Sequence, residues 1–339
     1  MPGTASQNRA VAGASFGDGL GRVRRASWVV VGLWVSTILV ALPPAVVLRG
    51  MIADHLGASL MAEAAATGVN LDWWNEFLAQ AVGIGQSFVP AVIGFAAVLD
   101  NLSRLADNRG LAPTLAGLMG AQIAVSLFLA GGVLDRLARD RALGAAAFFS
   151  ACGVWFFRFL RLGVVAGTAY WLLFAYVHPW LFDTLYTTWT HDLTVERTAF
   201  VIRSALYATF AAMVCSVNVI TDYAKIRAVV EDRRSMIGAL ASGVRFVARH
   251  PAQTGLLYLL NIAGFLLVVG GYLLAAPGAS AGMTAFAVGQ VFIVMRVVVR
   301  LQFAASQTAL FQRALAHAGY VARPLPTWPE SPAADAIGP

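Results

Sequence analysis

The side chains best suited to chemistry are isolated from one another in this sequence. The histidines show no His-x-x-x-His or Glu-x-x-His spacing, which paired metal ligands on one helix face would need. They are His55, His178, His191, His250 and His317. The only cysteines, Cys152 and Cys215, form no CxxC pair, and Walker A and His-Glu-x-x-His sequences are absent. We therefore expect no enzyme activity, no cofactor and no metal site.

Basic residues gather instead in two stretches, 135–161 and 222–252. Both read Asp-Arg followed, nine to eleven residues later, by Gly-Val-x-Phe, which suggests a weak internal repeat. We interpret them as amphipathic cytoplasmic elbows whose basic side chains contact anionic lipid or a partner protein. The alternative is that these charges only fix the topology of the chain. The candidate contact residues are Arg136, Arg139, Arg141, Arg158, Arg161, Lys225, Arg227, Arg233, Arg234, Arg245 and Arg249.

A second polar group, Asp100, Asn101, Ser103 and Arg104, follows a densely apolar stretch. Short polar side chains in this pattern commonly form a turn or helix cap. The same group could also form a small binding site on the outer face. The sequence leaves both interpretations open.

The elements that position these residues are long apolar helices. The chain is 59% hydrophobic and 12% charged, with a mean hydropathy of +0.71, outside the range of soluble globular proteins. Uncharged stretches of about 20 residues indicate membrane spans. We predict an all-α fold, a polytopic transmembrane bundle of six helices with interfacial amphipathic elbow helices. The spans are expected at about 26–48, 111–134, 162–182, 200–221, 253–275 and 283–304, within a membrane domain of residues 26–319.

The distribution of charge predicts the orientation. With both termini inside, 19 of the 24 Lys and Arg residues lie on the cytoplasmic side, as the positive-inside rule requires. With a seventh span at 77–99, the best alternative places the N-terminus outside and leaves eight basic residues there, so we interpret that segment as re-entrant or interfacial. Because the arginines collect in inter-span loops, nucleic acid is not an expected partner. The predicted location is the bacterial inner (plasma) membrane.

The remaining segments are predicted to be a cap and two tails. Residues 50–109 form an outer cap, in which Ile52, Leu56, Leu60 and Ala64 suggest a short interfacial helix. Trp73 and Trp74 follow as interfacial anchors. Residues 1–25 are expected to be a disordered cytoplasmic N-terminus. Residues 320–339 are expected to be a disordered Pro-rich cytoplasmic tail.

One spacing favours a transport function. Asp232, Gly238 and Pro251 stand at intervals of 6 and 13 residues, which is similar to the acidic–Gly–Pro spacing of the coupling loop in importer-type ABC permeases. The resemblance covers about 20 residues and implies contact with a nucleotide-binding subunit. The two alanines of that loop, and the apolar residues before its proline, are missing here.

Several phrases resemble an uncharacterised family of bacterial polytopic inner-membrane proteins. They are DYAKIR at 222–227, EDRR at 231–234, FFRFLRL at 156–162, IGF at 93–95 and LDNLS at 99–103. The repeated span–elbow–span architecture is also similar to the six-helix membrane domain of some glycerophosphodiester phosphodiesterases. No phosphodiesterase catalytic domain accompanies it, so the resemblance implies a fold and a compartment but no reaction.

The function predicted from these observations is a non-enzymatic membrane module that interacts with membrane lipids or docks an unidentified protein partner. The alternative is a permease or a permease subunit of a transport system.

Overall fold

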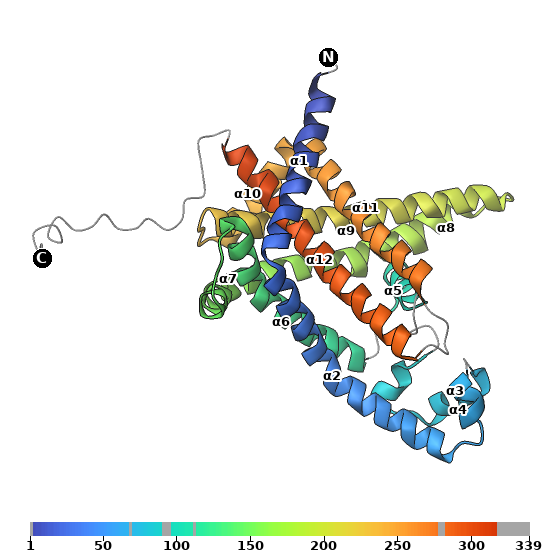
Figure 1. Ribbon diagram of the computed structural model, residues 1–339. Coiled ribbons are helices and arrows are strands. Elements are labelled where there is room, and N and C mark those ends of the chain that lie inside the picture. Colours follow the sequence, from blue (N-terminus) through green and yellow to red (C-terminus); the bar gives the residue numbers. More distant parts are fainter. Residues whose placement is uncertain (1–2, 68–69, 90–95, 111–112, 277–281, 317–339) are drawn as a thin grey trace, which may run out of the picture.

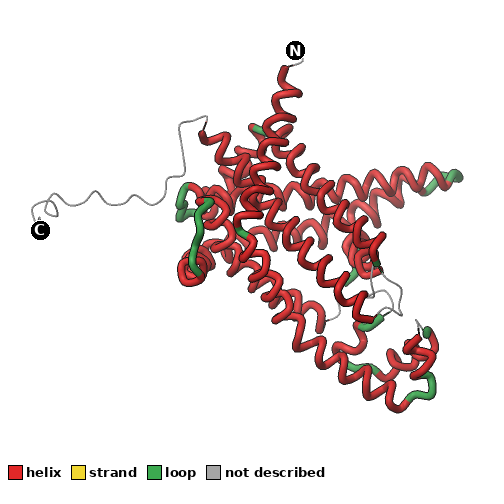
Figure 2. The backbone as a smooth tube through the Cα atoms, in the orientation of Figure 1, coloured by secondary structure: helices red, strands yellow, loops and turns green. Residues whose placement is uncertain are grey.

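The computed structural model describes residues 3–67, 70–89, 96–110, 113–276 and 282–316, and every regular element in these ranges is helical (Figure 1, Figure 2). Six helices are long and apolar enough to cross a membrane. They are Ser27–Ala58, Leu115–Arg139, Ala145–Thr190, Glu196–Val230, Pro251–Ala275 and Gly282–Leu315. The predicted all-α bundle with six spans is confirmed, and these helices indicate an integral membrane protein.

The spans belong to helices that run beyond their apolar stretches. Their bounds are α2 Ser27–Ala58, α6 Pro113–Arg139, α7 Ala145–Leu172, α9 Glu196–Val230, α11 Pro251–Ala275 and α12 Gly282–Ala316. Helix α7 continues without a loop through two π-helical segments, Leu173–Val177 and Trp180–Leu185, into α8 (Tyr186–Thr190). Pro179 lies between the two π segments, where its missing N–H group interrupts the α-helical hydrogen-bond pattern.

The N-terminal segment corrects one prediction. Residues 1–25 were expected to be disordered, but Gly3–Arg25 forms helix α1, which lies against α12 and α11 (Figure 1). Small residues permit this contact, because Ala12 and Ser15 are fully buried. At Gly19 even an added Cβ atom would come within 2.8 Å of the Ser306 backbone nitrogen. The segment looked disordered because its Ala, Ser and Gly content contributes little hydropathy.

Helix α2 corrects the boundary of the first span. It passes through Pro43 and Pro44 without a break and ends at Ala58, ten residues beyond the predicted end. Prolines are tolerated in membrane helices where neighbouring groups satisfy the freed carbonyls. The cap therefore begins near Ser59 rather than at residue 50. The predicted interfacial helix over Ile52 to Ala64 is split, since its first half is the last two turns of α2.

The cap consists of short helices. They are α3 Ala62–Thr67, α4 Leu71–Gln80, the 3₁₀ segment Gly83–Ser87 and α5 Ala96–Ala106. Trp73 and Trp74 are only 4% exposed and pack with Phe77, so they are not interfacial anchors as predicted. Their burial follows from α2, whose last turns supply Ile52 and Leu56 as packing partners.

Two predictions extend beyond the described residues. In segment 77–99, residues 77–89 hold the end of α4 and the 3₁₀ segment, while 90–95 lie outside the described ranges. The predicted tail, 320–339, lies entirely outside them.

The elbows take two different forms. Elbow 135–161 is no separate helix, because α6 continues to Arg139 and α7 begins at Ala145. Elbow 222–252 does contain a distinct helix, α10 (Met236–Arg249), whose first turn is capped by the Ser235 hydroxyl accepting from the Gly238 N–H at 3.2 Å. Pro251 then starts α11 at the first helical position, which suits its missing N–H.

Helix α10 folds back along the end of α9. The Tyr223 and Phe246 rings are 4.8 Å apart, and an added Cβ at Gly243 would lie 3.0 Å from the Ile220 carbonyl oxygen. Ile226 and Val230, two apolar residues of this elbow, are buried in the protein core. The apolar face of this elbow is therefore divided between protein contact and exposure.

The main core lies at the end of the molecule where the α1–α2 junction, the end of α6 and helix α10 are found. We call this the arginine-rich end. Residues from α1, α6, α7, α9, α10, α11 and α12 share a single buried cluster there. Along the spans, at most 28% of the residues in the most apolar window of each helix are buried within the protein. Apolar side chains that face outward over this length are suited to contact with lipid.

The contact of α1 with α12 generates the first prediction. Gly19→Ala is expected to lower the free energy of unfolding by about 1–3 kcal/mol, because the added methyl meets backbone rather than a flexible side chain. Thermal unfolding of the detergent-solubilised protein measures this. Gly13→Ala is the matched control: no atom lies within 4 Å of its Cβ position, and alanine favours the helix by up to about 1 kcal/mol. Equal effects of the two substitutions would contradict the close approach.

Candidate functional site

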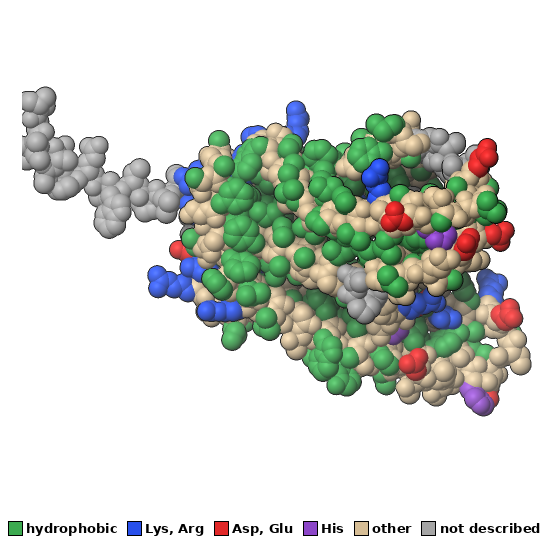
Figure 3. Space-filling model, turned by 90° about the horizontal axis from the view of Figure 1, so that it is seen from below, with side chains coloured by type: hydrophobic (Ala, Val, Ile, Leu, Met, Phe, Trp, Pro, Cys, Tyr) green, Lys and Arg blue, Asp and Glu red, His purple; other side chains and the backbone are tan. Residues whose placement is uncertain are grey.

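Positive charge is concentrated at the arginine-rich end. Figure 3 shows Lys and Arg side chains predominating at the left end of the molecule. The visible His and most visible Asp and Glu side chains lie at the right end, and hydrophobic atoms cover much of the surface between. This polarity agrees with the charge distribution read from the sequence.

The structure divides the eleven predicted contact residues into two groups. Six of them lie beside carboxylates, although Glu231 is shared by two of them and Asp140 also binds Arg25. The pairs are Arg136–Asp140 at 3.6 Å, Arg139–Asp135 at 2.7 Å, Arg158–Asp232 at 3.0 Å, Lys225–Asp222 at 3.1 Å, Arg227–Glu231 at 3.0 Å and Arg233–Glu231 at 2.5 Å. Five of these pairs are local in the sequence and only Arg158–Asp232 joins distant segments, but all six basic residues already have an anionic neighbour and are less available to an external anion.

Arg136 is the most deeply placed of these six, with 3% of its side chain exposed. It donates a hydrogen bond of 2.8 Å to the carbonyl oxygen of Arg25, at the junction of α1 and α2. Arg25 in turn binds Asp140 in two hydrogen bonds, of 3.1 and 2.5 Å. The end of α6 is thereby locked to the α1–α2 junction.

The charge of Asp140 is stabilised by this lock. Partial burial acts to raise its pKa, but the hydrogen bonds and charge of Arg25, with Arg22 and Arg136 nearby, outweigh burial and lower the pKa below its ordinary value. The same contact raises the pKa of Arg25, chiefly through the hydrogen bond to Asp140. The interaction is therefore present at neutral pH.

Asp140 and Asp232 share a backbone feature that explains the repeated Asp-Arg sequence. Both follow the end of a long helix, α6 or α9, and have positive φ angles of 47° and 46°. Aspartate tolerates this left-handed conformation better than most residues. Each then binds an arginine from another segment, Arg25 or Arg158, and Arg158 also lies 4.6 Å from the centre of the Trp155 ring.

The other five predicted contact residues are exposed. Among the described residues no carboxylate lies within 4.0 Å of any of them. They are Arg141 after α6, Arg161 on α7, Arg234 before α10, and Arg245 and Arg249 on α10. We call these five the unpaired arginines.

The polar cluster of Asp100, Asn101, Ser103 and Arg104 is satisfied within the protein. Arg104 binds Asp100 at 2.7 Å, and Asn101 donates to the Ala97 carbonyl of the same helix. Ser103 donates to Asp107, which also accepts a 3.0 Å hydrogen bond from Tyr207 on α9. These bonds, the one from Tyr207 foremost, lower the pKa of Asp107.

The end of α5 makes further contacts with the spans. Asn108 donates to the Phe174 carbonyl at 2.9 Å, and His178 lies 2.8 Å from the Ala106 carbonyl oxygen. Asp107, Asn108 and the Ala106 carbonyl thus dock the end of α5 onto the spans. Asp100, Asn101, Ser103 and Arg104 bond within the α5 segment, which supports their structural interpretation.

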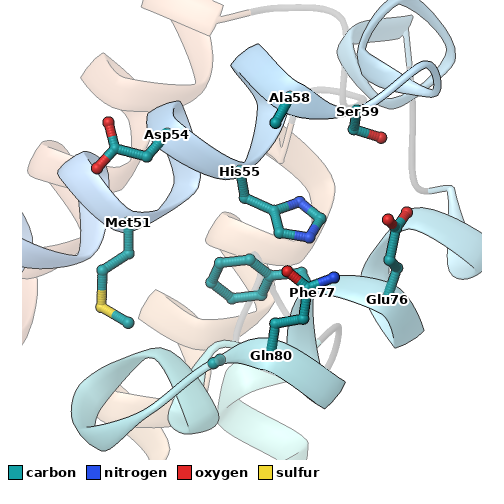
Figure 4. Close-up of a pocket in the computed structure, with 9 residues that line it drawn as sticks. Met51, Asp54, His55, Ala58, Ser59, Glu76, Phe77 and Gln80 are labelled. Atoms are coloured by element: carbon teal, nitrogen blue, oxygen red, sulfur yellow. The ribbon is translucent and has the colours of Figure 1, made fainter.

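The structure also reveals a cavity that the sequence did not indicate. It has a volume of about 430 Å³ and lies between the end of α2 and α4 (Figure 4). His55 points into it above Phe77, with the carboxylates of Asp54 and Glu76 at opposite sides. Within the described part of the chain, no three His, Cys, Asp or Glu side chains are grouped to hold a metal ion. The convergence of α2 and α4 depends on packing, so no sequence motif marked this cavity.

Ser15 lies in a Gly-x-Ser-x-Gly sequence, from Gly13 to Gly17. In a nucleophile elbow the serine occupies a sharp turn and is exposed. Here Ser15 lies within α1, is fully buried and donates to the Val11 carbonyl at 2.8 Å. The sequence pattern therefore forms part of the helix contact and no hydrolase site.

Comparison with known proteins adds no relative: no family model, no curated protein and no solved structure matches this chain. The resemblance to polytopic inner-membrane proteins and to phosphodiesterase membrane domains stays a prediction from the sequence.

The lock at Asp140 generates the second prediction. Asp140→Asn keeps a residue that tolerates positive φ but removes the charge, and leaves the nearly buried Arg136 without its carboxylate. We expect a loss of about 1–3 kcal/mol in the free energy of unfolding at pH 7. Thermal unfolding of the two proteins measures it.

The pH dependence follows from the lowered pKa. The contribution of Asp140 is fully present above the ordinary aspartate value of about 4 and is lost as the pH falls through the lower folded value. The difference between wild type and Asp140→Asn should therefore shrink at acid pH. Asp54→Asn, at an exposed position well beyond the first turn of α2, is the control and should change the free energy of unfolding by less than about 0.5 kcal/mol. A difference that persists at low pH would show that the loss is not electrostatic.

Proposed function

We propose that this protein is a non-enzymatic module of the bacterial inner membrane that binds anionic lipid, or docks a partner protein, through its arginine-rich end. Both termini would lie in the cytoplasm. The observation that carries the proposal is the group of five unpaired arginines, which remain exposed while six neighbouring basic residues are paired with carboxylates.

Helix α10 presents charge and apolar surface together. Ile237 is 77% exposed and Val244 44% exposed, while Arg245 and Arg249 lie one turn apart on the same short helix. A basic amphipathic helix at a membrane surface places apolar residues in the acyl boundary and arginines among the headgroups. Each arginine near an anionic surface contributes about 1 kcal/mol.

Burial of three reactive side chains supports a non-enzymatic role, whereas His55 faces the cavity beside α4 and His191 is exposed. Ser15, Cys152 and His178 are all buried, and each contacts a backbone carbonyl of the protein itself. None of them is placed to reach a substrate from solution.

A permease subunit is the second candidate. Asp232, Gly238 and Pro251 bracket a short helix, α10, between two spans at the arginine-rich end. A short helix in this position could contact a nucleotide-binding subunit. Purification in lipid nanodiscs with mass spectrometry of the bound proteins tests this candidate, because a stoichiometric ATPase would favour the permease.

The third prediction tests the unpaired arginines. Arg245→Gln with Arg249→Gln is expected to weaken binding of anionic lipid by about 1–2 kcal/mol, or roughly five- to thirtyfold. The measurement is the ratio of phosphatidylglycerol to phosphatidylethanolamine that co-purifies in native nanodiscs. Arg49→Gln with Arg197→Gln, two exposed arginines on the other side of the spans, is the matched control and should leave the ratio unchanged. Equal ratios for both double variants and the wild type would contradict the proposal.

The fourth prediction tests the orientation. In a protein with Cys152→Ser and Cys215→Ser, single cysteines are placed in the exposed loops by Ala142→Cys or Leu193→Cys. A membrane-impermeant maleimide should label Leu193→Cys in intact spheroplasts, and Ala142→Cys only after permeabilisation. The reverse pattern would place the arginine-rich end outside.

A further inference from the structure

Two more arginines lie within the apolar length of the last span. Arg296 and Arg300 are one turn apart on α12, so they share a face of the helix, and both are exposed at the protein surface. Within the described ranges neither has a carboxylate within 4.0 Å. Two neighbouring positive charges therefore lack a counter-ion in the protein.

Their positions along α12 bear on where they lie in a bilayer. Arg296 is 14 residues and Arg300 18 residues beyond Gly282, the first residue of α12. At about 1.5 Å per residue these positions are roughly 21 and 27 Å along the helix. A hydrocarbon core about 30 Å thick that began at Gly282 would include both Cα positions, in its half nearer the arginine-rich end.

The neighbouring helix offers polar groups at this level. The Arg300 Nη1 atom donates a 3.3 Å hydrogen bond to the Ser126 hydroxyl on α6, and Gln122 lies one turn from Ser126. Helices α6 and α12 pack together just beyond, where Val133 and Leu301 share a buried cluster. Ser126 is neutral, so it orients the guanidinium without balancing its charge.

The nearby acidic residue is already occupied. Asp222 exerts an electrostatic influence on Arg300, but its carboxylate binds the Lys225 ammonium at 3.1 Å. The Arg296 guanidinium lies 5.7 Å from the centre of the Phe292 ring, a cation–π contact that leaves its N–H groups free to donate.

We propose that Arg296, Arg300 and Ser126 bind the phosphate of one phospholipid at the boundary between α6 and α12, in the leaflet at the arginine-rich end. An arginine in this environment requires an anion, and the adjacent leaflet supplies phosphate. Guanidinium groups bind phosphate oxygens in bidentate fashion, and the serine hydroxyl can donate to a third oxygen. The acyl chains of such a lipid would lie along the exposed apolar side of α12.

This inference rests on the proposed function in that both involve anionic lipid, but it assigns a single site that differs from the unpaired arginines. The test is native mass spectrometry of delipidated protein titrated with dioleoylphosphatidylglycerol. Wild type should show one lipid adduct that survives the activation needed to strip the weaker adducts. Arg296→Gln with Arg300→Gln should weaken that adduct at least tenfold, and Ser126→Ala two- to fivefold.

The controls separate this site from the surface proposed above. Arg245→Gln with Arg249→Gln should keep the tight adduct while losing weaker ones. A tight adduct that survives Arg296→Gln with Arg300→Gln would overturn the site. The proposal for the unpaired arginines is tested separately, by Arg245→Gln with Arg249→Gln. Arg300→Lys keeps charge without the guanidinium fork and should bind with intermediate affinity, which excludes misfolding as the cause of the loss. Displacement of the lipid by millimolar inorganic phosphate would overturn the assignment to a phospholipid.

Discussion

The backbones of α1 and α12 approach so closely at Gly19 and Ser306 that no larger residue fits between them, and much of the architecture depends on this contact. It fixes α1 against the end of α12, and the α1–α2 junction then meets α6 through Arg25 and Arg136. Helices that would otherwise have only lipid around them are gathered at one end. The protein therefore has its core beside the membrane boundary, and its spans contribute less to that core than their hydropathy suggests.

The spans could be predicted because a bilayer imposes a length and an apolar composition on any helix that crosses it. The helix ends could not, since they depend on packing. Helix α2 continues past Arg49 because Ile52 and Leu56 find Trp73 and Phe77 to pack against. Helix α1 was not predicted for a different reason. Its Ala, Ser and Gly residues carry little hydropathy, although they permit the closest helix contacts.

The candidate site was predicted only as a region. Charge distribution identified the two basic stretches, but it could not separate Arg158, which binds Asp232, from Arg161, which is unpaired. That separation depends on which residues meet across segments. The left-handed aspartates Asp140 and Asp232 each bind an arginine from another segment, whereas Asp135, Asp222 and Glu231 bind basic residues close to them in the sequence. The cavity beside His55 had no sequence signal, because α2 and α4 meet there only in three dimensions.

The long third span has a mechanical consequence. From Ala145 to Thr190 the chain is helical for 46 residues without an intervening loop. At about 1.5 Å per residue this helix is close to 70 Å long, well over the thickness of a bilayer with its headgroups. Pro179 and the two π segments beside it are the features of this helix that permit bending. A movement of one end of the helix therefore reaches the other end through this region of the chain.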